Sequence, residues 1–115
     1  MANTFKVVTK AGVTSADVIY TVASSTTTII LGLIIGNTTS SSINATITLG
    51  TDTANRAGAN NETNQDVEIL TTTPVPGNSS LELLSGNKIV METTDTLSVT
   101  GSGAVDVVLS IMEIT

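Results

Sequence analysis

The sequence contains neither cysteine nor histidine. Without cysteine, neither a disulfide framework nor a thiolate metal site can form. Without histidine, the chain lacks the usual general base at neutral pH and the commonest ligand of transition metals. We therefore expect a protein that is not an enzyme and that needs no cofactor.

Basic and aromatic residues are also scarce. Four basic residues stand against ten acidic ones, which gives a formal net charge of −6. The basic residues are too few and too scattered to follow a phosphate backbone. Phe5 and Tyr20 are the only aromatic residues, so platforms for base stacking are missing. We expect no nucleic-acid partner.

Long hydrophobic runs are absent as well. The most apolar run covers residues 29–35, far short of the ~20 residues that a membrane helix needs. The first residues carry a charge but no apolar segment behind it, unlike a signal peptide. We expect neither a signal peptide nor a transmembrane segment, and no membrane partner.

The residues that are abundant favour strands. Thr, Ser, Val and Ile dominate, and no helical period persists along the chain. Gly, Asn, Asp and Pro separate the runs and supply turns. The pattern predicts one all-β domain over residues 1–115, a two-sheet sandwich of about eight or nine short antiparallel strands. Such a sandwich is either immunoglobulin-like or a small jelly roll.

Three strands are characteristic. Residues 26–36 are apolar on both faces, which predicts a strand in the middle of a sheet. The last strand, beginning at Val105, is long and apolar, so we expect it inside a sheet. Residues 43–49 alternate between apolar and polar, which predicts one solvated face.

The remaining boundaries follow from turn residues. We expect the first strand to end before Gly12, and residues 65–72 to form a strand with Val67 and Ile69 facing inward. Residues 74–78 contain both prolines and predict a turn outside any strand. Residues 85–87 predict a tight hairpin between two short strands.

Paired carboxylates are the first candidates for chemistry. Asp66 and Glu68 share one strand face, and Glu92 precedes Asp95 by three residues. A glycosidase sets two carboxyl groups across a sugar-sized cleft, and nothing in the sequence predicts that cleft. We interpret these acids as solvated, and we assign no catalytic or cofactor-binding residue.

Calcium is the second candidate. Asp52 and Glu62 supply carboxylates in a polar stretch, but the alternating acidic spacing of a calcium loop is missing. We therefore assign no metal ligand.

A long polar loop covers residues 50–64. Long ordered loops are usually functional. One reading is a surface excursion, and the other is an arm that orders against a neighbouring subunit. In the second reading Arg56 is the charged anchor, because arginine pairs bidentately with carboxylates, and Asn60 and Asn61 are further subunit contacts.

The N-terminal segment, residues 1–10, is a second candidate arm. An extended segment can add a strand to an exposed sheet edge. Phe5 and Lys6 are the residues that we expect at such a subunit contact.

Several segments resemble small virion structural proteins of tailed marine phages, cyanophages especially. They are residues 1–6, 25–33, 37–39, 76–81, 88–99 and 111–115. The resemblance spans most of the chain and implies a virion component without catalytic residues. The 50–64 loop looks longer and richer in Asn and Ala than in that family.

The resemblance implies a decoration or cement protein on the capsid exterior. It would act as a homo-oligomer against other virion proteins, and it would be located in a virion assembled in the host cytoplasm. A neck, tail or fibre-attachment component is an alternative in the same particle. A carbohydrate- or host-surface-binding module is an alternative from another class.

Overall fold

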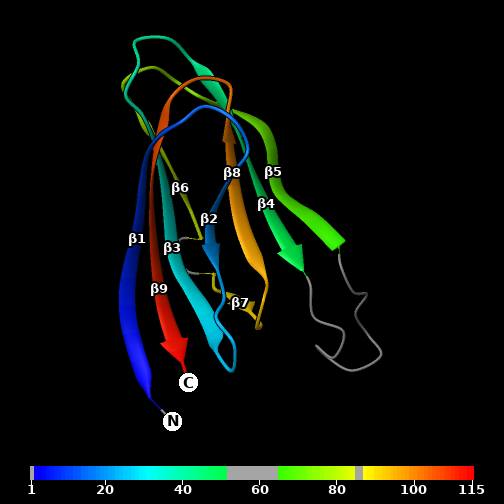
Figure 1. The fold of residues 1–115 in the computed structure, drawn as a ribbon. Coiled ribbons are helices and arrows are strands. Elements are labelled where there is room, and N and C mark those ends of the chain that lie inside the picture. The colour runs from blue at the N-terminus through cyan, green and yellow to red at the C-terminus, as the bar shows by residue number, and fades with distance from the viewer. Residues whose placement is uncertain (1, 52–64, 85–86) are drawn as a thin grey trace.

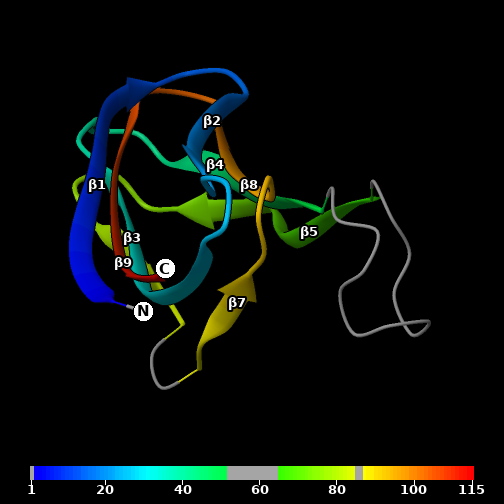
Figure 2. The same ribbon diagram turned by 60° about the horizontal axis from the view of Figure 1, so that its bottom comes forward.

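The computed structural model describes residues 2–51, 65–84 and 87–115. The described chain forms two antiparallel sheets that face each other (Figures 1 and 2). The five-stranded sheet has the order β1-β9-β3-β6, and β7 also pairs with β3. Its strands are β1 (Asn3–Val13), β3 (Thr27–Asn37), β6 (Ser80–Leu83), β7 (Ile89–Met91) and β9 (Val105–Ile114).

The four-stranded sheet has the order β2-β8-β4-β5. Its strands are β2 (Asp17–Thr21), β4 (Ile43–Thr51), β5 (Gln65–Val75) and β8 (Thr96–Gly101). The chain crosses between the sheets after β1, β2, β3, β5, β7 and β8. These crossings and the strand order match a jelly roll rather than an immunoglobulin domain.

The core lies between the inner faces of the sheets. β3 contributes Ile30, Leu33 and Ile35, none more than 1% exposed. Alternate residues of β9, from Val105 to Ile111, are buried in the same way. The alternation follows from the two-residue period of a strand, which sends successive side chains to opposite faces.

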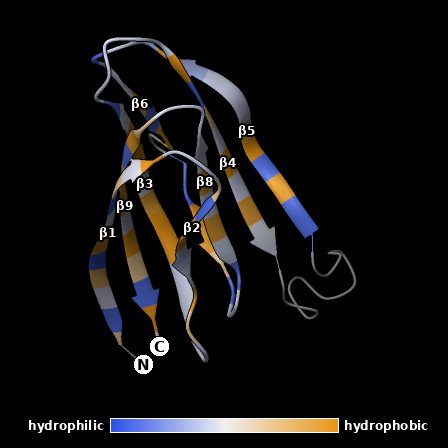
Figure 3. Ribbon diagram, turned by 45° about the horizontal axis from the view of Figure 1, so that its top comes forward, coloured by the Kyte–Doolittle hydropathy of each residue, from blue (hydrophilic) through white to orange (hydrophobic). Residues whose placement is uncertain are grey.

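The interior position of the two apolar strands is confirmed. β3 lies between β9 and the β6/β7 pair, and β9 lies between β1 and β3. Hydrophobic residues are prominent along both strands in Figure 3.

Two strand ends differ from the prediction. β1 continues through Gly12 to Val13, with a shift of register between Lys10 and Val13. Gly12 has a φ of 70°, so it accommodates a bulge rather than ending the strand. β5 includes Pro74, paired with Asn44, which is tolerated because β5 is an edge strand.

Two other predictions had different outcomes. Val67 pairs with Leu49, which packs against the core, so its side chain projects to the inner side as predicted, although it is 47% exposed on this edge strand. Bands of hydrophilic and hydrophobic residues alternate along this edge strand (Figure 3). β6 and β7 do not form a hairpin with each other, since both pair with β3, at residues 33–36 and 28–30.

Candidate functional site

The outer face of the five-stranded sheet carries a continuous apolar row. Phe5 pairs with Met112, Met112 with Ile29, and Ile29 with Val90. Paired residues on neighbouring strands project to the same side of a sheet. These four side chains therefore cross β1, β9, β3 and β7 on the side away from the core.

This face gathers most of the exposed apolar surface. Seven large hydrophobic residues are exposed in the described part of the chain, and five of them project from this face. They are Phe5, Val7, Ile34, Val90 and Val108. Single exposed hydrophobic residues are ordinary, whereas a contiguous patch marks an interaction site.

Charge is nearly absent from the same face. At the paired positions of the described strands, its charged residues are Asp106, opposite Gly36, and Glu82, opposite Ile34. Both lie toward one end of the sheet, away from the row that begins at Phe5. The middle of the face is therefore neutral on a chain whose net charge is −6.

A polar cluster joins the two sheets on their inner side. The Lys6 ammonium lies 2.6 Å from Oε1 of Glu113. The Tyr20 hydroxyl donates a 2.5 Å hydrogen bond to Oε2 of the same carboxylate. The Thr28 hydroxyl lies 2.7 Å from the phenolic oxygen and supplies its other hydrogen bond. The cluster thus connects β2 of one sheet with β1, β3 and β9 of the other.

The ionisation of this cluster suits a structural role. Burial, followed by the hydrogen bond to Glu113, raises the pKa of Tyr20 to about 12. The Lys6 hydrogen bond, then that of Tyr20, lowers the pKa of Glu113 from its ordinary 4.5. An acid–base catalyst works best with a pKa near the operating pH. Both shifts move away from neutrality, so at neutral pH Tyr20 keeps its proton and Glu113 stays ionised, the state in which they link the two sheets.

The candidate carboxylates differ in their surroundings. The interpretation of Asp95 as solvated was wrong, because Asp95 is fully buried and its Oδ2 accepts a 2.9 Å hydrogen bond from the backbone N–H of Glu92. Glu68 accepts a hydrogen bond from the Thr71 hydroxyl. Asp66 lies in an exposed position on β5.

Asn37 is a buried polar residue whose role the sequence did not reveal. It is 2% exposed, and its amide group donates to the backbone carbonyls of Ser41, Val75 and Pro76. Its side-chain oxygen accepts from the backbone N–H of Thr39 at 2.9 Å. Asn37 therefore fixes the loop after β3 to the end of β5.

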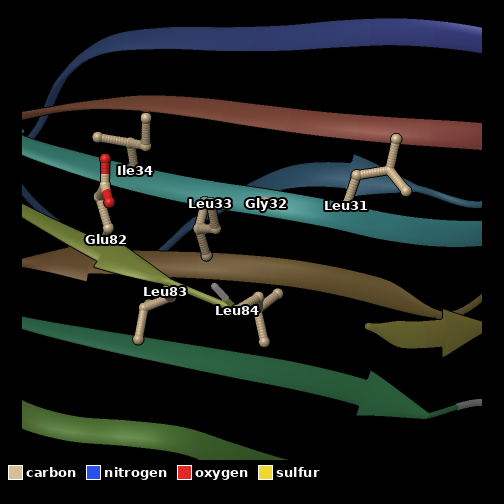
Figure 4. Close-up of a pocket in the computed structure, with 7 residues that line it drawn as sticks. All are labelled: Leu31, Gly32, Leu33, Ile34, Glu82, Leu83 and Leu84. Carbon is tan, nitrogen blue, oxygen red and sulfur yellow. The ribbon is translucent and has the colours of Figure 1, made fainter. Parts of the chain in front are cut away.

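A small cavity lies where the β6/β7 edge is interrupted. It has a volume of about 210 Å³ and lies between residues 31–34 of β3 and residues 82–84. Figure 4 shows Leu33 and Leu83 pointing to one side of β3, and Leu31 and Ile34 to the other. Glu82 points the same way as Ile34 and Leu31, so its carboxylate lies on the side of β3 opposite to Leu33 and Leu83.

The predicted contact residues, and the two acids considered for calcium, fall into two groups. Phe5 is 72% exposed on the outer face, and Lys6 forms the ion pair described above. Arg56, Asn60 and Asn61 lie outside the described residues, as do Asp52 and Glu62. The N-terminal segment is not a separate arm, because it is β1 and pairs with β9 of its own sheet.

Two searches of the described residues found nothing. Outside the three undescribed stretches, no group of three or more acidic, histidine or cysteine residues could hold a metal ion. In the same part of the chain, no helix is long and apolar enough to cross a membrane.

The outer-face residues of β9 form part of the apolar face and were not predicted as a surface. Val108, Met112 and Ile114 alternate with the core residues and are themselves apolar. Apolar residues on both sides of this strand could have indicated an exposed apolar face as well as burial inside a sheet.

Comparison with known proteins does not identify a relative. No family model, no curated protein and no solved structure matches the chain. The resemblance to virion proteins therefore stays a prediction.

Proposed function

We propose that this chain is a non-enzymatic structural protein of a bacteriophage particle, and that it decorates the exterior of the capsid. The observation that supports this function best is the exposed, neutral, apolar sheet face on a jelly-roll domain. Such a face is suited to covering another protein surface.

The architecture supports the same function by analogy. Jelly rolls occur in viral capsid proteins and also in lectins. Because a fold alone does not determine function, the choice between these uses depends on the resemblance to phage virion proteins and on the surface. Lectin-like binding through stacked rings has little support, since Tyr20 is tied into the polar cluster and Phe5 is the only other aromatic residue.

The proposed mechanism is adhesion repeated over a lattice. Each copy covers a modest apolar area on other virion proteins, either the major capsid protein or proteins of the neck and tail. Many weak contacts on a repeating surface give a high total avidity without a tight single interface. The neutral face avoids the desolvation cost that buried charges would add.

Copy number in purified particles tests this function. Quantitative mass spectrometry of intact virions should find the chain in a fixed simple ratio to the major shell protein, near one to one or a small fraction of it. A ratio of roughly one in a hundred would place it at the neck, tail or fibres, where the symmetry allows few copies. Its absence from the particle would overturn the virion function and favour a surface-binding module.

A further inference from the structure

We infer that the outer face of the five-stranded sheet is a self-association surface that binds the same face of a second copy of this chain. This inference rests on the proposed function only in expecting a homo-oligomer. What is new is the surface through which the copies bind and the identity of the partner, a second copy of the chain. A two-fold pair uses one patch twice, so the patch must be complementary to itself in shape and in charge.

The shape of the face meets this requirement. Phe5 projects with 72% of its surface exposed, and it belongs to the apolar row with Met112, Ile29 and Val90. The next row across β9 and β3 pairs Ser110 with Gly32, two of the smallest side chains. Apart from its chain neighbours, no atom lies within 4 Å of where a Cβ on Gly32 would be.

A raised row therefore lies beside a lowered one on the same surface. Leu31, at the irregularity in the β3–β9 register, points to the same side as Ile34 and borders Gly32 (Figure 4). When two such faces meet across a two-fold axis, the Phe5 ring of each copy has space above Gly32 and Ser110 of the other. A large aromatic residue that fills a desolvated hollow is a common energetic centre of an interface.

Electrostatics favour a second copy over a partner of strong charge. Two copies carry a net charge of −6 each and would repel each other if acidic surfaces met. The middle of this face is neutral, and its charged residues, Asp106 and Glu82, lie toward one end. The two-fold axis that sets Phe5 over Gly32 and Ser110 passes between those two rows, and Asp106 and Glu82 both lie beyond the Gly32 row. Their symmetry copies therefore lie on the opposite side of the axis.

The size of the face is sufficient for a weak dimer. The strands β1, β9 and β3 are about 10 residues long, and the short strands β6 and β7 share the fourth position beside β3. At about 4.8 Å between strands and about 3.3 Å per residue, they give roughly 600 Å². Specific interfaces begin at about 1,200 Å² in total, or about 600 Å² from each partner. Interfaces at this low end of the size range are mostly weak, so we expect a dissociation constant in the micromolar range.

Sedimentation equilibrium of the purified chain, from about 1 to about 200 µM, tests the inference. The wild type should form dimers, and Phe5→Ser should raise the dissociation constant roughly tenfold or more. Val18→Ser, matched in chemistry and 52% exposed on β2 of the other sheet, should leave it unchanged. The inference would be overturned if the wild-type chain stayed monomeric over this range, or if V18S weakened the dimer as much as F5S does.

Gly32→Leu separates specific docking from general stickiness. It adds apolar surface, so non-specific association would increase. Specific docking predicts a decrease, because the leucine fills the hollow that receives Phe5. Circular dichroism should show that F5S and G32L are folded, since Phe5 is exposed and the position of a Gly32 side chain is open. A stronger dimer from G32L would contradict the inference.

Crosslinking provides a readout that does not depend on losing an interaction. The chain has no cysteine, so Ser110→Cys places a single thiol near the middle of the face. Facing sheets lie about 10 Å apart, beyond the Cα separation that a disulfide spans, so a short bismaleimide is the suitable reagent. It should join S110C into dimers far faster than the control Val67→Cys on β5. Equal crosslinking rates for the two variants would argue against face-to-face packing. The copy number in purified virions tests the virion function separately.

Discussion

The hydroxyl of Tyr20 in the four-stranded sheet donates a 2.5 Å hydrogen bond to the carboxylate of Glu113 in the five-stranded sheet. These residues are 93 positions apart in the chain, so the bond forms only when both sheets are in place. Lys6 and Thr28 complete the cluster from two further strands. The cluster is a direct polar link between the sheets.

Tyr20→Phe tests the strength of that link. The ring remains, but Glu113 loses a donor and the Thr28 hydroxyl loses its acceptor. We expect the free energy of unfolding to fall by about 1–2 kcal/mol, which lowers the melting temperature by several degrees. Urea denaturation measures the change. Thr71→Val, which removes an exposed hydrogen bond to Glu68, is the control and should have little effect.

Acid stability should depend on Glu113. Its folded pKa lies below the ordinary 4.5, chiefly because of the hydrogen bond from Lys6. As the pH falls, the unfolded state therefore binds the proton before the folded state does. The contribution of Glu113 to stability is complete above about pH 4.5 and is lost as the pH falls through the folded pKa. Glu113→Gln should remove this component from a plot of unfolding free energy against pH. Lys6→Met should reduce it, and an unchanged plot for both variants would contradict the assignment.

Alkaline stability should depend on Tyr20. Its pKa is raised to about 12 from 10.0, so the folded state retains the phenolic proton after the unfolded state has lost it. The contribution is complete below pH 10.0 and decreases as pH rises toward about 12. Tyr20 is the only tyrosine and there is no tryptophan, so tyrosinate absorbance reports this group alone. A midpoint near 10.0 in the folded protein would show that the cluster does not form.

Asn37→Ala should be costly for a single polar substitution. Its amide donates to three backbone carbonyls and its oxygen holds the Thr39 amide. Leaving such buried groups without partners should cost roughly 2 kcal/mol. Thermal unfolding compares this variant with Asn44→Ala at an exposed position of β4. Equal stability of the two variants would mean that the Asn37 contacts contribute little.

The fold class and the interior strands were predictable because they depend on local patterns. Alternation and apolar runs identify strands, and the runs of β3 and β9 indicate burial on both sides. The break between β6 and β7 was misread, since Gly86 and its neighbours look like a hairpin turn whichever strand the flanking segments pair with. Pairing of that kind is decided by distant residues of β3.

The clusters at the two ends of the sandwich could not be predicted for a similar reason. Nothing near Tyr20 in the sequence indicates Glu113, and nothing near Asn37 indicates the carbonyl of Val75. The outer apolar face needed the strand register, because only the pairing brings Phe5 beside Met112 and Ile29. Phe5 itself was predicted as a contact residue, and the face around it emerged from the structure.

As the proposed decoration protein, this chain should stabilise a particle from its outer surface, and the most direct measurement compares particles assembled with and without it. Heat-induced release of the packaged nucleic acid should occur at a lower temperature in particles that lack the chain. Adding the purified wild-type chain should restore the original temperature. Particles whose release temperature is the same with and without the chain would contradict the claim.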